Sequence, residues 1–126
     1  MNTISMTSLQ QYNIQPSNVV VSWYEYGSIT ANGEPYNNLG LTCASPNLPF
    51  NTILTLQANK KTIEVRVNDR GPFAVDNTGK AIYPLQPHPV RKLDLSKGAF
   101  QELIGDLSIG VSVVEILEVK FPKEEC

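Results

Sequence analysis

One short stretch of the chain, residues 65–73, holds the side chains best suited to acid–base chemistry. It reads Val-Arg-Val-Asn-Asp-Arg-Gly-Pro-Phe, so that the carboxylate of Asp69 is followed by Arg70 and a Gly-Pro pair. The alternation of apolar and polar residues over 63–68 predicts a β-strand, which ends here because proline cannot donate a hydrogen bond to a sheet. A carboxylate at the end of a rigid strand suits a general acid or base. The alternative is a structural role, in which Asp69 caps the turn or pairs with Arg70.

Several short strands must position this stretch. Segments that are rich in β-branched and aromatic residues, or that alternate in polarity, predict strands over residues 19–26, 51–57, 61–68 and 111–121. Ser96 is a natural N-cap for one short helix over residues 97–104. Residues 73–92 are rich in proline and predict a long surface loop, of a length that is uncommon in a small domain unless the loop binds something. Short strands, Gly/Pro turns and one helix together favour a mainly β protein, a small barrel rather than a sandwich or a parallel α/β sheet.

Length and charge narrow the function classes. A chain of 126 residues is expected to form one domain. The net charge of −2 argues against a nucleic acid as partner, because no basic patch is available to neutralise phosphates. No apolar run approaches the length of a membrane span. Residues 1–17 lack the basic start and apolar centre of a signal peptide, so we expect an extended N-terminal arm there, a barrel over residues 18–121 and a charged tail over residues 122–126.

The cysteines and the histidine give weak signals. Cys43 and Cys126 are too few for a disulfide framework and have no metal-ligand spacing, so we expect neither a metal nor another cofactor. Cys43 stands among apolar and small residues, which favours a buried inert thiol, and a bridge to Cys126 stays open as an alternative. The single histidine, His88, falls in the proline-rich loop, where we expect it to be solvated.

Five segments stand out when the chain is compared with known families. They are Val21–Tyr24, Thr30–Glu34, Leu48–Thr52, Asn68–Phe73 and Leu93–Ser96. Taken in this order and at this spacing, they resemble the rare lipoprotein A (RlpA) family of bacterial septal lytic transglycosylases. The resemblance covers about residues 19–119 and implies a six-stranded double-psi β-barrel with one short helix. Expansins and barwin-like proteins share this fold, so the fold is better supported than the activity.

The resemblance also implies an acidic glycan groove. Asp69 matches the family's catalytic acid/base, and Glu34 is expected beside it, stabilising positive charge on the sugar or raising the pKa of Asp69. Asp94 matches a second acidic position that faces the groove in expansin-like relatives. The structural alternatives are that Glu34 reaches back to loop amides and that Asp94 tethers the loop or caps the helix.

Other positions are expected to contact the substrate. Trp23 and Tyr24 match aromatic residues near the groove, where they stack on sugar faces, although a tryptophan in a strand is often a core residue. The guanidinium of Arg70 is expected to point away from Asp69, since turning inward would oppose a raised pKa, and a structural ion pair is its alternative role. Ser45 stands where the family usually has a histidine, so Ser45→His is expected to raise activity if the groove is otherwise intact.

The resemblance implies a peptidoglycan-directed domain that cuts bonds between N-acetylmuramic acid and N-acetylglucosamine as a lytic transglycosylase does. The alternative is a catalytically weak or inactive barrel that binds glycan or serves a structural role. The setting is expected to be extracytoplasmic: a virion, such as a phage tail or baseplate, or the bacterial periplasm and envelope. In that setting the partners are peptidoglycan glycan strands and, through the N-terminal arm, other virion or envelope proteins.

Overall fold

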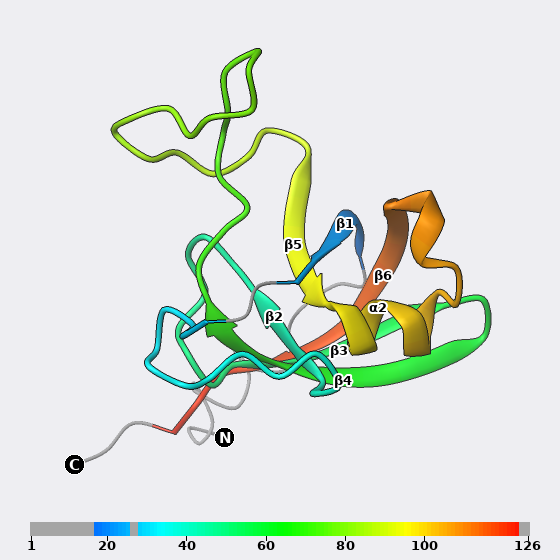
Figure 1. Cartoon of the computed structure of the whole chain (residues 1–126). Coiled ribbons are helices and arrows are strands. Elements are labelled where there is room, and N and C mark those ends of the chain that lie inside the picture. Colours follow the sequence, from blue (N-terminus) through cyan, green and yellow to red (C-terminus); the bar gives the residue numbers. More distant parts are fainter. Residues whose placement is uncertain (1–16, 26–27, 124–126) are drawn as a thin grey trace.

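Within the residues that the computed structural model describes, 17–25 and 28–123, six strands close into one barrel (Figure 1). The elements in chain order are β1 (Ser17–Tyr24), β2 (Thr42–Ala44), β3 (Ile53–Ala58), β4 (Lys61–Asp69), β5 (Arg91–Ser96), helix α2 (Lys97–Leu103), a 3₁₀ turn η1 (Leu107–Ile109) and β6 (Val111–Lys120). The barrel order is β1-β5-β2-β4-β3-β6. The predicted N-terminal arm lies outside the described residues except for Ser17, which begins β1.

The barrel is mixed rather than a simple meander. β1 pairs with β5, and β2 with β4, in parallel, while the other neighbours are antiparallel. Because β5 lies between β1 and β2, strands distant in sequence become neighbours around the barrel. The described residues therefore form a mainly β, closed six-stranded barrel with one short helix, which confirms the predicted fold class.

Alternating side chains build the core. Ile63, Val65 and Val67 of β4 are buried, and so are Leu93 and Leu95 of β5, as the period of two in a strand requires. Helix α2 adds further buried residues: Ala99, Phe100 and Leu103. The Ser96 hydroxyl accepts a hydrogen bond from the Ala99 amide at 3.1 Å, so the predicted N-cap is confirmed.

The element boundaries differ from the predictions at a few places. β3 begins at Ile53, two residues later than predicted, because Asn51 has a positive φ of 74° that no strand accommodates. β1 ends at Tyr24 rather than residue 26, and the helix ends at Leu103 with Ile104 as its C-cap. The three-residue strand β2 was not predicted, since a segment this short shows no period.

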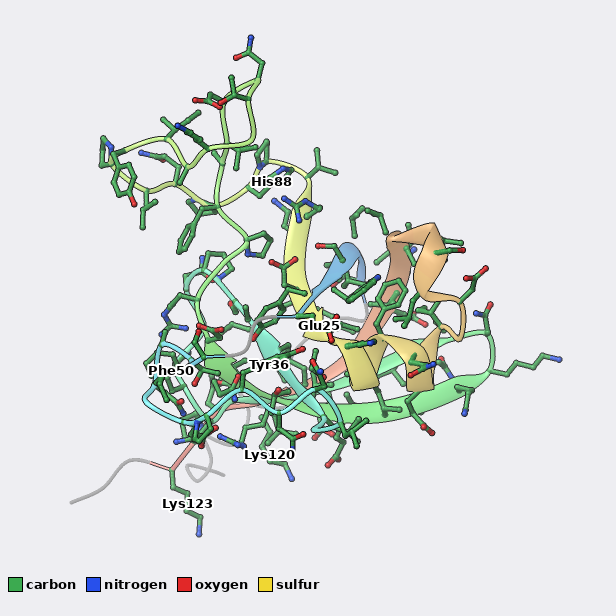
Figure 2. All side chains as sticks on the ribbon, viewed as in Figure 1. Glu25, Tyr36, Phe50, His88, Lys120 and Lys123 are labelled. Carbon is green, nitrogen blue, oxygen red and sulfur yellow. The ribbon has the colours of Figure 1, made fainter. Side chains whose placement is uncertain are left out.

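The predicted long loop connects β4 to β5 and projects beyond the barrel, where its green to yellow-green trace is the most prominent feature of Figure 1. β5 begins at Arg91, two residues inside the predicted loop. His88 lies at the foot of the loop (Figure 2). Its Nδ1 accepts hydrogen bonds from the amides of Val90 and Arg91 at 3.1 and 3.0 Å, so the imidazole, expected to be only solvated, holds the entry into β5.

Of the two cysteines, the structure describes Cys43, for which a buried inert thiol was predicted. Cys43 in β2 is fully buried and forms no disulfide within the described part of the chain. Burial raises the pKa of this thiol, which keeps it protonated. Cys126 lies outside the described residues, so the alternative of a bridge to it stays open.

Candidate active site

The unpredicted strand β2 brings two aspartates together. Ala44, its last residue, is the register partner of Asp69 in β4 on one side and of Asp94 in β5 on the other. The pairing shifts between Cys43 and Ala44, because Cys43 is opposite Val67 and one residue of β4 is then skipped. Bulges of this kind often re-aim a side chain next to a functional site. Here the shift aligns Asp69, the last residue of β4, with Ala44.

Three hydrogen-bond donors converge on the Asp69 carboxylate. The Tyr24 hydroxyl donates to Oδ2 at 2.9 Å. The amides of Ala31 and Arg70 donate to Oδ1 at 2.8 and 2.9 Å. The donors come from β1, from the loop after it and from the turn that ends β4. They fix the orientation of the carboxylate, as a group that exchanges protons with a bound substrate requires.

The Asp94 side chain is 18% exposed and has its own partners. The Ser22 hydroxyl donates a short hydrogen bond to Oδ1. Arg91 donates to Ser22 Oγ at 2.9 Å and lies 3.5 Å from Asp94 Oδ1. Burial raises the pKa of Asp94, and the hydrogen bond from Ser22 and the charge of Arg91 only partly offset this effect. Asp94 therefore retains a proton to a higher pH than an ordinary aspartate does.

The two aspartates share an open depression of about 350 Å³. Its lining includes Tyr24, Ala44, Asp69, Arg70, Asp94 and Arg91 from the barrel end, and Gly71, Pro72, Phe73, Val75, Gly79 and Ala81 from the projecting loop. The depression thus has a polar floor carried by the barrel strands and a largely apolar wall carried by the loop. Such a combination suits a ligand with both hydroxyl groups and apolar faces.

Tyr24 and Trp23 face opposite sides of the sheet. Tyr24 donates to Asp69, and burial together with the charge of Asp69 raises its pKa, so it stays a neutral donor. Trp23 packs against the core instead, and its Nε1 donates to the Leu107 carbonyl at 3.0 Å. Adjacent strand residues point in opposite directions, so the two aromatics could not both face one groove. The geometry supports the core alternative for Trp23.

Glu34 lies in a separate depression, lined with Arg66 and Asn68 rather than with the two aspartates. Its two carboxylate oxygens each accept a hydrogen bond from Arg66 at 2.9 Å, and Asn68 donates to Oε1 at 3.0 Å. These hydrogen bonds, that of Arg66 first, lower the pKa of Glu34 to about 2. The expected partnership of Glu34 with Asp69 therefore gains no support from the geometry.

Arg70 and Ser45 hold the loop behind Asp69. The Arg70 guanidinium donates to the carbonyls of Ser45 and Leu48 at 3.2 and 2.8 Å and stacks 3.9 Å from the centre of the Phe50 ring. It turns away from the Asp69 carboxylate, as expected. Ser45 is only 1% exposed, and its hydroxyl accepts hydrogen bonds from the amides of Asn47 and Leu48. Its side chain does not line the depression.

Three residues that position side chains of the site were not predicted from the sequence. Ser22 and Arg91 hold Asp94, and the Tyr36 hydroxyl donates to the Tyr24 carbonyl at 2.5 Å while its ring lies 5.0 Å from that of Tyr24. Ser22 is two residues before Tyr24 in the same strand, a spacing that places both on one face and that could have revealed it. Tyr36 lies in a loop and gave no such signal.

Two features are absent from the described residues. No cluster of three or more histidine, cysteine or acidic side chains there could hold a metal ion. No helix there is both long and apolar enough to cross a membrane.

Comparison with known proteins extends this picture. The sequence model of the lytic transglycolase family matches residues 17–116. Endolytic peptidoglycan transglycosylase RlpA of Campylobacter jejuni is 44% identical over 89 residues, which are 67% of this chain and 27% of that protein. The probable endolytic peptidoglycan transglycosylase RlpA of Synechocystis is 40% identical over 102 residues, 77% of this chain and 27% of that protein. The chain thus spans about a quarter of the length of these two relatives.

A solved structure matches the fold. The Streptomyces papain inhibitor superposes with a TM-score of 0.56, covering 81% of this chain and 93% of that protein at 23% sequence identity. An identity this low supports a shared fold and nothing about activity. The closed mixed barrel is that of a double-psi β-barrel domain. The chain belongs to the lytic transglycolase family, as an RlpA-like member.

Proposed function

We propose that this domain cleaves the glycan strands of peptidoglycan as a lytic transglycosylase. The observation that carries the proposal is the shared depression in which Asp69 and Asp94 flank Ala44. The relatives from Campylobacter and Synechocystis bear names that state this reaction, although the chain spans only part of their length. A pair of carboxyl groups in different environments is a common arrangement for acid and base work on glycosidic bonds.

In the proposed reaction, Asp69 is the acid/base. Its protonated carboxyl group gives the proton to the glycosidic oxygen of the leaving N-acetylglucosamine as the bond to C1 of N-acetylmuramic acid breaks. The resulting carboxylate then removes the proton of the muramic C6 hydroxyl, whose oxygen bonds to C1 and closes a 1,6-anhydro ring. No water is consumed, and Asp69 recovers its proton. The Tyr24 hydroxyl suits both steps, because it can donate to the carboxylate or accept from the acid.

Asp94 is proposed as the second carboxyl group of the site. Burial raises its pKa, so it keeps its proton to a higher pH than an ordinary aspartate and limits the negative charge beside Asp69 over that range. Ser22 and Arg91 orient it, so it also forms the polar edge of the depression against which sugar hydroxyl groups bind. Glu34 and Trp23 are left out of the proposed catalytic machinery because their side chains are engaged elsewhere.

A glycan-binding module without turnover is the second candidate. It is favoured by the burial of Ser45, at the position where the family resemblance implies a histidine, because a buried hydroxyl bound to loop amides cannot exchange protons with a substrate. Under this alternative the depression would bind glycan strands and release no product.

Mass spectrometry of purified sacculi after incubation with the protein tests the two candidates. Anhydro-muropeptides are the expected product, whereas new reducing ends would indicate a hydrolase. Binding to sacculi with no soluble product would instead establish the binding module. The setting we propose, a virion tail or the bacterial envelope, is tested by fractionation, and recovery of the protein only from the cytoplasm would contradict it.

A further inference from the structure

The loop between β4 and β5 is built as an ordered projection. It comprises residues 70–90 and is called the β4–β5 loop below. Bridges join Phe73 with Pro87 and Val75 with Ala81, so the loop runs outward and returns as a pair of facing segments. Backbone hydrogen bonds connect the two sides at Pro72–His88 (3.0 Å), Ala74–Gln86 (2.8 Å) and Asp76–Lys80 (2.8 Å). A long loop with this many internal bonds keeps a defined shape, as binding loops in small domains do.

The β4–β5 loop concentrates exposed apolar side chains. Five of the eleven exposed large hydrophobic residues among the described ones lie in its 21 positions: Val75, Ile82, Tyr83, Leu85 and Val90. Tyr83 is 78% exposed. Scattered surface hydrophobics need no explanation, but a cluster on a projecting loop marks an interaction surface.

This apolar surface is continuous with the candidate active site. Residues of the loop, among them Phe73, Val75 and Ala81, line the same depression as Asp69 and Asp94. Ile82 follows Ala81 directly, and its amide donates to the Ala74 carbonyl at 3.1 Å, which ties the exposed segment to the lining one. A strand that enters the depression must therefore pass beside the loop.

The charges on the loop favour an uncharged part of a ligand as its partner. The Asp76 carboxylate is occupied by its own turn, accepting from the Thr78 amide and hydroxyl and from the Lys80 amide at 2.6 to 3.0 Å. Along residues 71–87 the only charged side chains are Asp76 and Lys80, whose charges are opposite, so this stretch carries no net charge. Amino-sugar rings present apolar C–H faces and acetyl methyl groups, which pack against tyrosine and aliphatic side chains. Stem peptides of peptidoglycan carry charged groups that this surface does not match.

We propose that the β4–β5 loop is a binding wall for the glycan strand. It contacts the amino-sugar rings next to the bond at Asp69 through Val75, Ile82, Tyr83 and Leu85. The inference deepens the proposed function and rests on it for the identity of the glycan. Its consequence is that glycan affinity, rather than proton transfer, depends on these side chains.

Sedimentation with sacculi measures this affinity. The parent is the full chain with Asp69→Asn, incubated briefly in the cold, and the test variant adds Ile82→Ser, Tyr83→Ser and Leu85→Ser. We expect Kd to rise about tenfold, as loss of an exposed aromatic and aliphatic contact surface typically causes. The matched control is Val113→Ser, which removes a 57% exposed apolar side chain on β6, outside the depression, and should leave Kd unchanged.

Two substrates distinguish the ligand groups. Glycan strands freed of stem peptides by an amidase are soluble, because the cross-links of sacculi run through the peptides, so their affinity is measured by competition with sacculi. They should show the same loss of affinity as intact sacculi, because the sugars remain. A loss seen only with intact sacculi would overturn the assignment to sugars, and equal binding by parent and test variant on both would overturn the wall itself. The four substituted side chains are exposed, so equal melting temperatures should show that the variants are folded.

The loop inference and the proposed transglycosylase function can fail independently of each other. If the unmodified chain releases anhydro-muropeptides but the loop substitutions change neither affinity nor KM, the loop inference fails alone. If glycan binding depends on the loop but no product forms, the loop inference stands and the transglycosylase proposal fails.

Discussion

Asp69 and Asp94 lie on strands separated by β2, and both are in register with Ala44. The relationship depends on one irregularity, the skipped residue in the pairing of β2 with β4. With a regular register, Asn68 rather than Asp69 would be opposite Ala44. The geometry of the candidate site therefore depends on this bulge and on the small methyl side chain of Ala44. A larger side chain at position 44 would stand between the two carboxyl groups in the depression that they share.

Glu34 is predicted to stabilise the fold through Arg66 rather than to act in catalysis. Its lowered pKa means that its ionised form is favoured in the folded protein. This contribution is fully present above the ordinary pKa of 4.5 and is lost as the pH falls toward about 2. Glu34→Gln should therefore lower the free energy of unfolding near neutral pH by about 1 kcal/mol, since the pair is partly exposed. Urea unfolding across this pH range measures the effect.

The control for this prediction is Glu102→Gln. Glu102 pairs with Lys61 at 3.3 Å, and both side chains are more than half exposed, so its loss should change stability little at any pH. A Glu34→Gln variant as stable as the unmodified protein at neutral pH would contradict the structural role.

Asp94 should show the opposite dependence on pH. Its pKa is raised by burial, so the stability it contributes is fully present below its ordinary value of 3.8 and is lost as the pH rises through its folded pKa. Asp94→Asn cannot ionise and escapes this loss. Relative to the unmodified protein, the variant should become more stable between pH 3.8 and neutrality, whatever its offset at low pH.

The measurement is the difference in unfolding free energy between the two proteins at several pH values. Ser22, Arg91, His88 and Asp69 influence this carboxyl group and are unchanged in the variant, so their own titration largely cancels in the difference. If the difference in unfolding free energy does not vary with pH, folding does not raise the pKa of Asp94, which would contradict the prediction.

Ser45 is predicted to be structural, in contrast to the expectation drawn from family resemblance. Ser45→Ala removes the acceptor for the amides of Asn47 and Leu48 and should cost about 1 kcal/mol of stability. Ser45→His must force an imidazole into a buried position and should destabilise further rather than raise activity. Thermal melting checks both, with the exposed Ser28→Ala as the control. A stable, more active Ser45→His variant would restore the original expectation.

Four of the six strands (β1, β3, β4 and β6), the capped helix and the projecting loop could be predicted from sequence because each depends on local signals, whereas β5 was not predicted as a strand. β4 alternates over residues 63–67, and Ser96 stands directly before a helix. β2 could not be found this way, since three residues between turns have no period. Without β2 the barrel order and the meeting of Asp69 with Asp94 at Ala44 stay hidden.

Side-chain direction limited the prediction of the site. The motif containing Trp23 and Tyr24 suggested two groove aromatics, but alternation allows only one of them on that face, and Tyr24 is the one bonded to Asp69. Glu34 was expected beside Asp69 or, as the alternative, bonded to loop amides. Its carboxylate pairs with Arg66 instead, and nothing in the sequence indicates that Arg66 lies opposite its loop.

The last prediction concerns Asp69→Asn. The asparagine carbonyl can accept the amide hydrogen bonds of Ala31 and Arg70 at the Oδ1 position, and its NH₂ group can donate to the Tyr24 hydroxyl, which then turns from donor to acceptor. The variant should therefore fold and bind sacculi normally. It cannot cycle a proton, so release of anhydro-muropeptides should fall by about 10²–10⁴-fold.

Asp106→Asn makes the same chemical change outside the depression, at an exposed cap of η1, and should retain full turnover. Tyr24→Phe removes one donor to Asp69 while leaving the carboxyl group, so it should lower turnover by less than Asp69→Asn does. This ranking separates proton transfer from shape, because all three variants keep the fold. Mass spectrometry quantifies the product in each case. Equal product from Asp69→Asn and the unmodified protein would show that the acid/base is another group, and Asp94 would then be the carboxyl group left to test in the same depression.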